Sequence, residues 1–172
     1  LEELIPCVSR NKIYQGRLKD NNILVSINGK YGVCSDRGEM LVACAYDSIG
    51  LSSDVFIAML ANGLSGLIAF DGQELFPFVA YQIVELQPDF ILVRDEQKRY
   101  GALNYQGKMI VPVKNKREQV DKKVELYAKK TNLTNENMLA LERIKHAHNT
   151  YLQRDAQALL AREKTIKAQQ KI

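Results

Sequence analysis

The side chains that could carry out chemistry are few in this sequence, and they are scattered along it. The two histidines, His146 and His148, are two residues apart. On a helix, residues at this spacing point about 200° apart, so the two imidazoles do not converge on one metal ion. No Ser, Cys or carboxylate stands at a spacing that would recruit either imidazole as a catalytic base. We therefore expect no enzyme activity and no metal or other cofactor.

The three cysteines are Cys7, Cys34 and Cys44. An odd count without Cys-x-x-Cys spacing predicts neither a disulfide framework nor a zinc site. Each cysteine lies among apolar residues, where a thiol acts as a small hydrophobe. This usage slightly favours a cytoplasmic location and leaves the compartment open.

The longest run without a charged residue, residues 55–70, contains Asn62, Gly63, Ser65 and Gly66. At 16 residues it is shorter than the roughly 20 needed to span a bilayer. Its Gly-x-x-Gly string resembles the one with which KH domains hold a nucleic-acid backbone between helices. Here the string falls between two strand-like segments, so we predict a hairpin turn and no membrane span.

A repeat of 34 to 35 residues organises the first two thirds of the chain. Its anchors are Tyr31-Gly32, Ser65-Gly66 and Tyr100-Gly101. Three residues before the first two anchors stand Asn28-Gly29 and Asn62-Gly63, pairs typical of type I′ hairpin turns. A second glycine follows each anchor glycine by six residues, and apolar segments flank both turns. We assign turn roles to eight glycines: Gly29, Gly32, Gly38, Gly63, Gly66, Gly72, Gly101 and Gly107.

Each copy therefore predicts a three-stranded antiparallel meander, which must stack on its neighbours to bury its apolar face. The fold class expected is a mainly β repeat array followed by an α-helical carboxy-terminal arm. The units span about residues 20–54, 55–89 and 90–113. Residues 1–19 form a remnant, because Leu4-Ile5-Pro6 matches Ile110-Val111-Pro112. We expect the chain to be a piece of a larger protein, whose total number of repeats stays open.

This pattern resembles the WG repeat family, also called KWG-type, which is found mainly in bacteria. The resemblance covers about residues 1–113, and Gly29-Lys30-Tyr31-Gly32 with Ala45-Tyr46-Asp47 is its best copy. The chain has no tryptophan; Tyr31, Ser65 and Tyr100 stand where the family has Trp. The resemblance implies a β-rich binding or scaffold module and supplies no catalytic motif.

Beyond Pro112 the composition changes. Residues 1–113 contain 10 Lys and Arg against 13 Asp and Glu, whereas residues 114–172 contain 14 against 7. All glycines and prolines precede residue 114. We predict a basic helical arm, residues 114–172, with helices at about 118–130 and 135–171 and with Thr134 as the N-cap of the second helix.

Apolar residues form a stripe along one side of the second helix. His148, Asp155 and Arg162 interrupt this stripe, which does not suit a strict coiled-coil seam. We predict that the stripe binds a protein partner, folds back on the first helix or mediates self-association. Its members are Met138, Leu141, Ile144, Tyr151, Leu152, Leu159 and Ile166.

The leading hypothesis is a non-catalytic protein–protein interaction or scaffold module. One alternative is an accessory domain that binds nucleic acid through its basic helices, although Lys and Arg are interleaved with Glu and Asp there. Another is a non-catalytic fragment of an enzyme whose active domain precedes Leu1. The sequence identifies neither the partner nor the oligomeric state.

Overall fold

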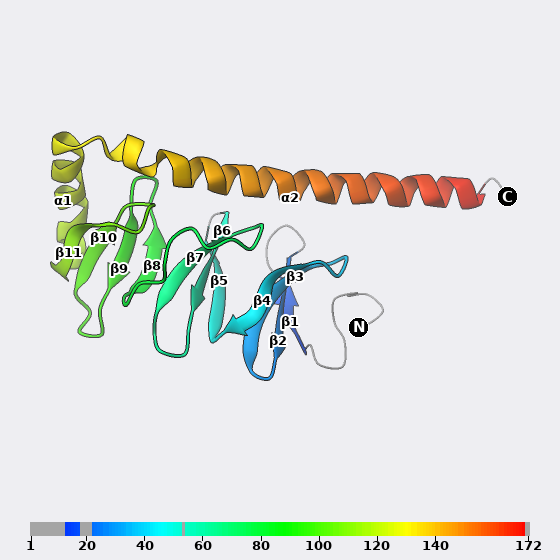
Figure 1. The fold of residues 1–172 in the computed structure, drawn as a ribbon, viewed down its shortest axis with the longest axis horizontal. Coiled ribbons are helices and arrows are strands. Elements are labelled where there is room, and N and C mark those ends of the chain that lie inside the picture. Colours follow the sequence, from blue (N-terminus) through cyan, green and yellow to red (C-terminus); the bar gives the residue numbers. More distant parts are fainter. Residues whose placement is uncertain (1–12, 18–21, 53, 171–172) are drawn as a thin grey trace.

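The computed structural model describes residues 13–17, 22–52 and 54–170, and it has three antiparallel sheets in a row followed by two helices (Figure 1). The predicted fold class, a mainly β array followed by a helical arm, is confirmed. The remnant predicted at residues 1–19 lies largely outside the described residues.

The first and third sheets have four strands each, and the second has three. The first contains β1 (Ile13–Arg17), β2 (Asn22–Ile27), β3 (Lys30–Ser35) and β4 (Met40–Tyr46). The second contains β5 (Ser48–Ser52), β6 (Val55–Met59) and β7 (Ser65–Ala69). The third contains β8 (Gln82–Leu86), β9 (Ile91–Arg94), β10 (Tyr100–Leu103) and β11 (Met109–Asn115).

Each sheet has one more strand at its amino-terminal side than the predicted meander: β1, β5 or β8. Residues 48–52 and 82–86, near the ends of the predicted units 20–54 and 55–89, pair as β5 and β8 with the next strand. In the middle unit, the third strand that a three-stranded meander requires after Gly72 is reduced to isolated bridges, Ile68 with Glu74 and Ser65 with Val79.

The turn that closes the second hairpin of each unit has one geometry throughout. In each copy the glycine N–H donates to the carbonyl three residues earlier: Gly38 to Ser35, Gly72 to Ala69 and Gly107 to Asn104. These glycines have φ of 91°, 87° and 86°. Because this left-handed region is unfavourable for other L-residues, the turns explain why glycine recurs at this offset.

The first hairpin turns differ between copies. Asn28 and Gly29 both have positive φ, 53° and 79°, as the type I′ prediction requires. In the second unit, by contrast, Gly63 has φ of 84° and Asn62 does not have positive φ, so the type I′ prediction is wrong there. Leu60 and Leu64 pair across a longer loop, and Lys98 has the left-handed conformation at the same place in the third unit.

Three of the eight predicted turn glycines lie within strands. Gly32, Gly66 and Gly101 occupy β3, β7 and β10. A Cβ on Gly32 or Gly101 would lie 2.6 Å from a carbonyl oxygen of the neighbouring strand, and one on Gly66 would lie 2.4 Å from the Phe78 ring. The turn assignment is therefore corrected at these positions, where close packing excludes a side chain.

Apolar side chains fill the sheets and the spaces between them. One cluster joins the first two units through Val33, Phe56 and Phe70, and another joins the second and third through Val55, Leu67 and Ile91. Cys34 is fully buried beside Ile23 and Val25, and it is also disulfide-bonded, which the cysteine count did not predict.

The helices cover the array on two sides (Figure 1). α1 (Arg117–Lys130) packs Val120 and Val124 against the third sheet. Its first turn is closed by the Gln119 side chain, whose oxygen accepts from the Lys116 N–H at 3.0 Å. α2 (Leu133–Gln170) runs across all three sheets and continues past the described part of the first one (Figure 1). It begins before the predicted Thr134 cap, because the Asn132 side chain accepts from the Asn135 N–H at 3.1 Å.

Candidate interaction surface

The amino-terminal end of α2 is fixed to the turns of the third sheet by the hydrogen bonds of one buried side chain. The Asn137 side chain, 1% exposed, accepts from the Tyr105 N–H at 2.8 Å and donates to the Asp89 carbonyl at 2.7 Å. Burial, with the nearby charge of Asp89, raises the pKa of Tyr105 to about 12. The third sheet and α2 therefore form one hydrogen-bonded unit.

Glu136 ties this unit to α1. Its carboxylate accepts from Asn104 Nδ2 at 3.0 Å and from the Tyr127 hydroxyl at 2.9 Å. The hydrogen bond from Asn104, helped by Tyr127 and by the charge of Lys108, lowers the pKa of Glu136. Because both bonds stabilise the ionised form, this junction is strongest when the carboxylate is charged.

The middle of α2 is seated on the second sheet. Tyr151, 4% exposed, packs edge-on against Phe70 with ring centroids 5.7 Å apart. His148 covers the same ring at 5.2 Å, and its Nδ1 lies 3.5 Å from an Asp54 carboxylate oxygen. These contacts give both His148 and Tyr151 a packing role.

Two arginines of α2 reach equivalent positions in successive units. Arg143 hydrogen-bonds to Gln73, and Arg154 forms an ion pair with Glu39 at 3.0 Å. Gln73 and Glu39 both stand seven residues after the anchor glycine of their unit. The arginines are eleven residues apart, which is three helical turns or about 16.5 Å. Between the second and the first unit, α2 therefore advances by three turns.

The buried side of α2 follows a regular pattern up to Tyr151. Its members recur at alternating intervals of four and three: Leu133, Asn137, Ala140, Ile144, Ala147 and Tyr151. Sequence reasoning missed Leu133, which precedes the predicted helix, and Asn137, Ala140 and Ala147, which are polar or small. Their spacing was the signal available, since it continues the phase of Ile144 and Tyr151.

The predicted partner-binding stripe is divided by this arrangement. Ile144 and Tyr151 face the array. The other five are exposed by 37% to 53%: Met138, Leu141, Leu152, Leu159 and Ile166.

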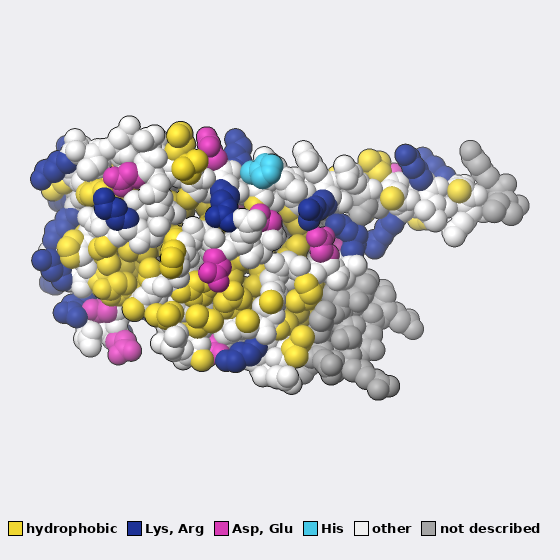
Figure 2. Space-filling view, in the orientation of Figure 1, with side chains coloured by type: hydrophobic (Ala, Val, Ile, Leu, Met, Phe, Trp, Pro, Cys, Tyr) yellow, Lys and Arg dark blue, Asp and Glu magenta, His cyan; other side chains and the backbone are white. Residues whose placement is uncertain are grey.

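Exposed apolar surface is concentrated on α2. Ten large hydrophobic residues are exposed in the described part of the chain, and seven of them belong to this helix. Every side chain described between Leu152 and Gln170 is exposed. We call residues 152–170 the overhang; Figure 2 shows it projecting beyond the array with hydrophobic and basic side chains side by side.

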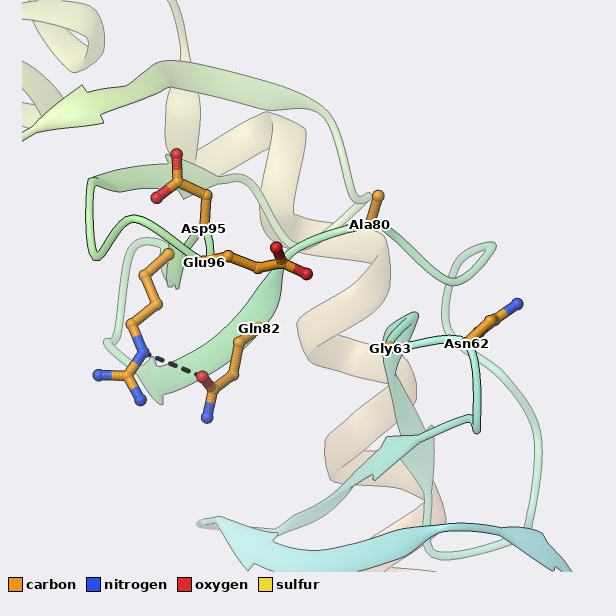
Figure 3. A pocket seen from close by; sticks show the side chains of 7 residues that line it. Asn62, Gly63, Ala80, Gln82, Asp95 and Glu96 are labelled. Atoms are coloured by element: carbon orange, nitrogen blue, oxygen red, sulfur yellow. Dashed lines mark hydrogen bonds between the residues drawn. The ribbon is translucent and has the colours of Figure 1, made fainter.

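A polar hollow of about 200 Å³ lies between the second and third units. It is lined by Asn62, Gly63, Ala80, Gln82, Arg94, Asp95 and Glu96. In Figure 3, Glu96 extends toward Ala80 while Asp95 points away, and Arg94 Nε donates to Gln82 at 2.9 Å.

The Asp95 carboxylate forms hydrogen bonds within its own turn. Its carboxylate accepts from the Arg99 N–H at 2.9 Å and from Arg99 Nε at 2.7 Å. Desolvation acts in the opposite direction, yet these bonds and the charge of Arg99 hold the pKa of Asp95 below its usual value. Several polar side chains that line the hollow are therefore hydrogen-bonded to other protein groups. Among the residues that the structure describes, no group of three or more His, Cys, Asp or Glu could hold a metal ion.

Comparisons with known proteins identify no family. No family model matches the chain, and no curated protein matches it. Among solved structures, the computationally designed Ika4 protein is similar over 51% of this chain and 62% of the designed one, less than two thirds of its length. The TM-score is 0.37 and the sequence identity is 14%. Within the described residues, no helix is long and apolar enough to cross a membrane.

Proposed function

We propose that this chain is a non-catalytic protein–protein interaction module. The β array is the base, and α2 is an arm that presents its exposed apolar stripe to a protein partner. The observation that carries the proposal is the concentration of exposed large hydrophobic residues on α2, seven of ten in the described part of the chain. Large apolar side chains gathered on one exposed element are typical of interaction sites.

The way α2 is held supports the same function. Asn137 and Tyr151 anchor one half of the helix. The overhang therefore extends from a fixed root, and a partner does not have to pay for ordering that root on binding. An isolated helix of the same length would lack this advantage.

The resemblance to WG repeats belongs to the same proposal. It rests on the glycine offsets and on the shared turn geometry at Gly38, Gly72 and Gly107. If the array is of this kind, it is a scaffold whose units bury one another and whose appended arm does the binding.

The test compares capture by matched variants. Leu159 and Leu139 are 53% and 69% exposed, on the overhang and on the seated half respectively. We expect cross-linking in a cell extract to join wild-type chain and Leu139→Glu to the same protein partner, and Leu159→Glu to lose that partner. Equal capture by all three proteins, or capture by none, would contradict the proposal.

A further inference from the structure

Two Asn-Gly pairs lie in hairpin turns of the array, and the proposed function uses neither of them. Asn28-Gly29 joins β2 to β3, and Asn62-Gly63 lies in the loop between β6 and β7. All four residues are exposed. An asparagine before glycine is chemically labile, because the next backbone nitrogen can attack the side-chain amide and glycine has no Cβ to obstruct it. The two turns therefore share one chemistry, and the structure around each pair sets its rate.

We propose that Asn28 is a site of spontaneous deamidation in the folded protein and that Asn62 is protected from the same reaction. The Gly29 nitrogen gives its proton to hydroxide and attacks Cγ of Asn28. The new C–N bond closes a five-membered imide, the bond from Cγ to the amide nitrogen breaks, and ammonia leaves with a proton taken from water. Water then opens the imide at one of its two carbonyls and yields aspartate or isoaspartate. Water is the only co-reactant, and nothing is oxidised or reduced.

The reacting groups are unrestrained in the first turn. Within the part of the chain that the structure describes, neither the Asn28 side chain nor the Gly29 N–H forms a hydrogen bond with another protein group. The turn is closed on either side of the pair, where Ile27 lies opposite Lys30. The Asn28 amide can therefore rotate toward the Gly29 nitrogen, and Gly29 can lose its proton, without breaking a hydrogen bond of either group.

The same groups are held in the second turn. The Asn62 side-chain oxygen accepts from the Leu64 N–H at 3.1 Å, an arrangement typical of asparagine in turns. The Gly63 N–H donates to the Leu60 carbonyl at 2.9 Å. Deamidation at Asn62 therefore has to break one bond to turn the amide and another to release the nucleophile. Two bonds of ordinary strength slow such a step by about tenfold or more.

Deamidation changes both the charge and the backbone at the tip of the first hairpin. Either product adds a carboxylate near Lys30, which already pairs with Asp47. Isoaspartate also lengthens the backbone of the turn by one carbon. β2 pairs with β3 without a register shift up to Ile27 opposite Lys30, and a two-residue loop fixes that register. We therefore expect isoaspartate to weaken the pairing of β2 with β3, which aspartate at the same position leaves in register.

Timed incubation of the full chain at mildly alkaline pH tests the inference, with peptide mass spectrometry following the product at each asparagine. We expect the folded chain to lose the amide of Asn28 at least about tenfold faster than that of Asn62. The urea-unfolded chain should lose both at similar rates, because unfolding removes the two hydrogen bonds of the second turn. Equal rates at the two sites in the folded chain, or no product at Asn28, would overturn the inference.

The variant Asn28→Asp is the matched control, since it keeps a turn-forming residue but has no amide to lose. We expect its folded chain to release ammonia at least about tenfold more slowly than the wild-type chain. Undiminished release would mean that another amide is the labile one and would overturn the assignment to Asn28. A difference between Asn28 and Asn62 that persists in urea would trace it to neighbouring residues in the sequence, and it would overturn the protective role of the second turn.

Discussion

At the scale of single residues, glycine recurs for two different reasons, backbone conformation and close packing. The sequence showed their constant offsets, and from these we predicted turns at all eight. Gly38, Gly72 and Gly107 are needed for positive φ, whereas Gly32, Gly66 and Gly101 are needed because a neighbouring strand or ring leaves no space for a Cβ. Offsets alone could not distinguish these causes, since both exclude a side chain.

Gly101→Ala tests the packing explanation. The added Cβ would lie 2.6 Å from the Val111 carbonyl oxygen and 2.8 Å from a Val113 methyl, so we expect a loss of about 1–3 kcal/mol in the free energy of unfolding. Gly50→Ala is the matched control, because its Cβ would have no atom within 4 Å. Chemical denaturation measures both variants, and equal losses would refute the explanation.

Asn137 carries the hydrogen bonds between α2 and the third sheet. Asn137→Ala leaves the buried Tyr105 N–H without a partner and removes the bond to the Asp89 carbonyl, and we expect a loss of about 2–4 kcal/mol of stability. Asn149→Ala, an exposed position on the same helix, should change stability by less than about 0.5 kcal/mol. Denaturation curves that coincide for the two variants would contradict the anchoring role.

At the scale of elements, α2 divides into a seated half and an overhang. The sequence identified the helix and its apolar positions, but it could not show which of them the array would cover. Ile144 and Tyr151 are covered because they share a face with Asn137 and Ala140, and the other predicted partner residues stay exposed because they lie on another face or beyond the array. Which face is buried depends on contacts between residues far apart in the chain, which local periodicity does not record.

Tyr151→Ala tests how much the packing of α2 against the array contributes to stability. Removing a ring that is 4% exposed and packed against Phe70 should cost about 3–5 kcal/mol. Leu152→Ala changes the next residue, which is 41% exposed, and should cost about 1 kcal/mol or less. Thermal or urea unfolding compares the two, and the opposite ranking would place the buried face elsewhere.

The junction of α1, α2 and the third sheet should respond to acid through Glu136. Its pKa is lowered in the folded chain, chiefly by the hydrogen bond from Asn104, so its contribution to stability is full above the usual value of about 4.5 and is lost as the pH falls through the lower folded value. The difference in unfolding free energy between wild type and Glu136→Gln should therefore shrink below about pH 4.5. Glu142→Gln, an exposed change on the same helix, is the control; a difference that grows on acidification would contradict this sign.

At the scale of the whole molecule, the repeat period predicted the array, and the change in composition after Pro112 predicted the helical arm and where it begins. The strands β5 and β8 were missed because Gly50 and the polar residues around Gln82 weaken the alternation that identifies a strand. They pair because the adjacent hairpin offers an open edge, which is again a property of the assembled sheet. Once the array is assembled, its first two units contact α2 at positions eleven residues apart.

Hydrogen exchange along α2 tests most directly whether the first half of the helix is covered by the array and the overhang is available to a partner. We predict strong protection for the amides of residues 137–151 and exchange at least about 100-fold faster for those of residues 156–168, because the array supports only the first set. Equal protection along the whole helix would mean that something already covers the overhang, and it would contradict its role as a docking arm.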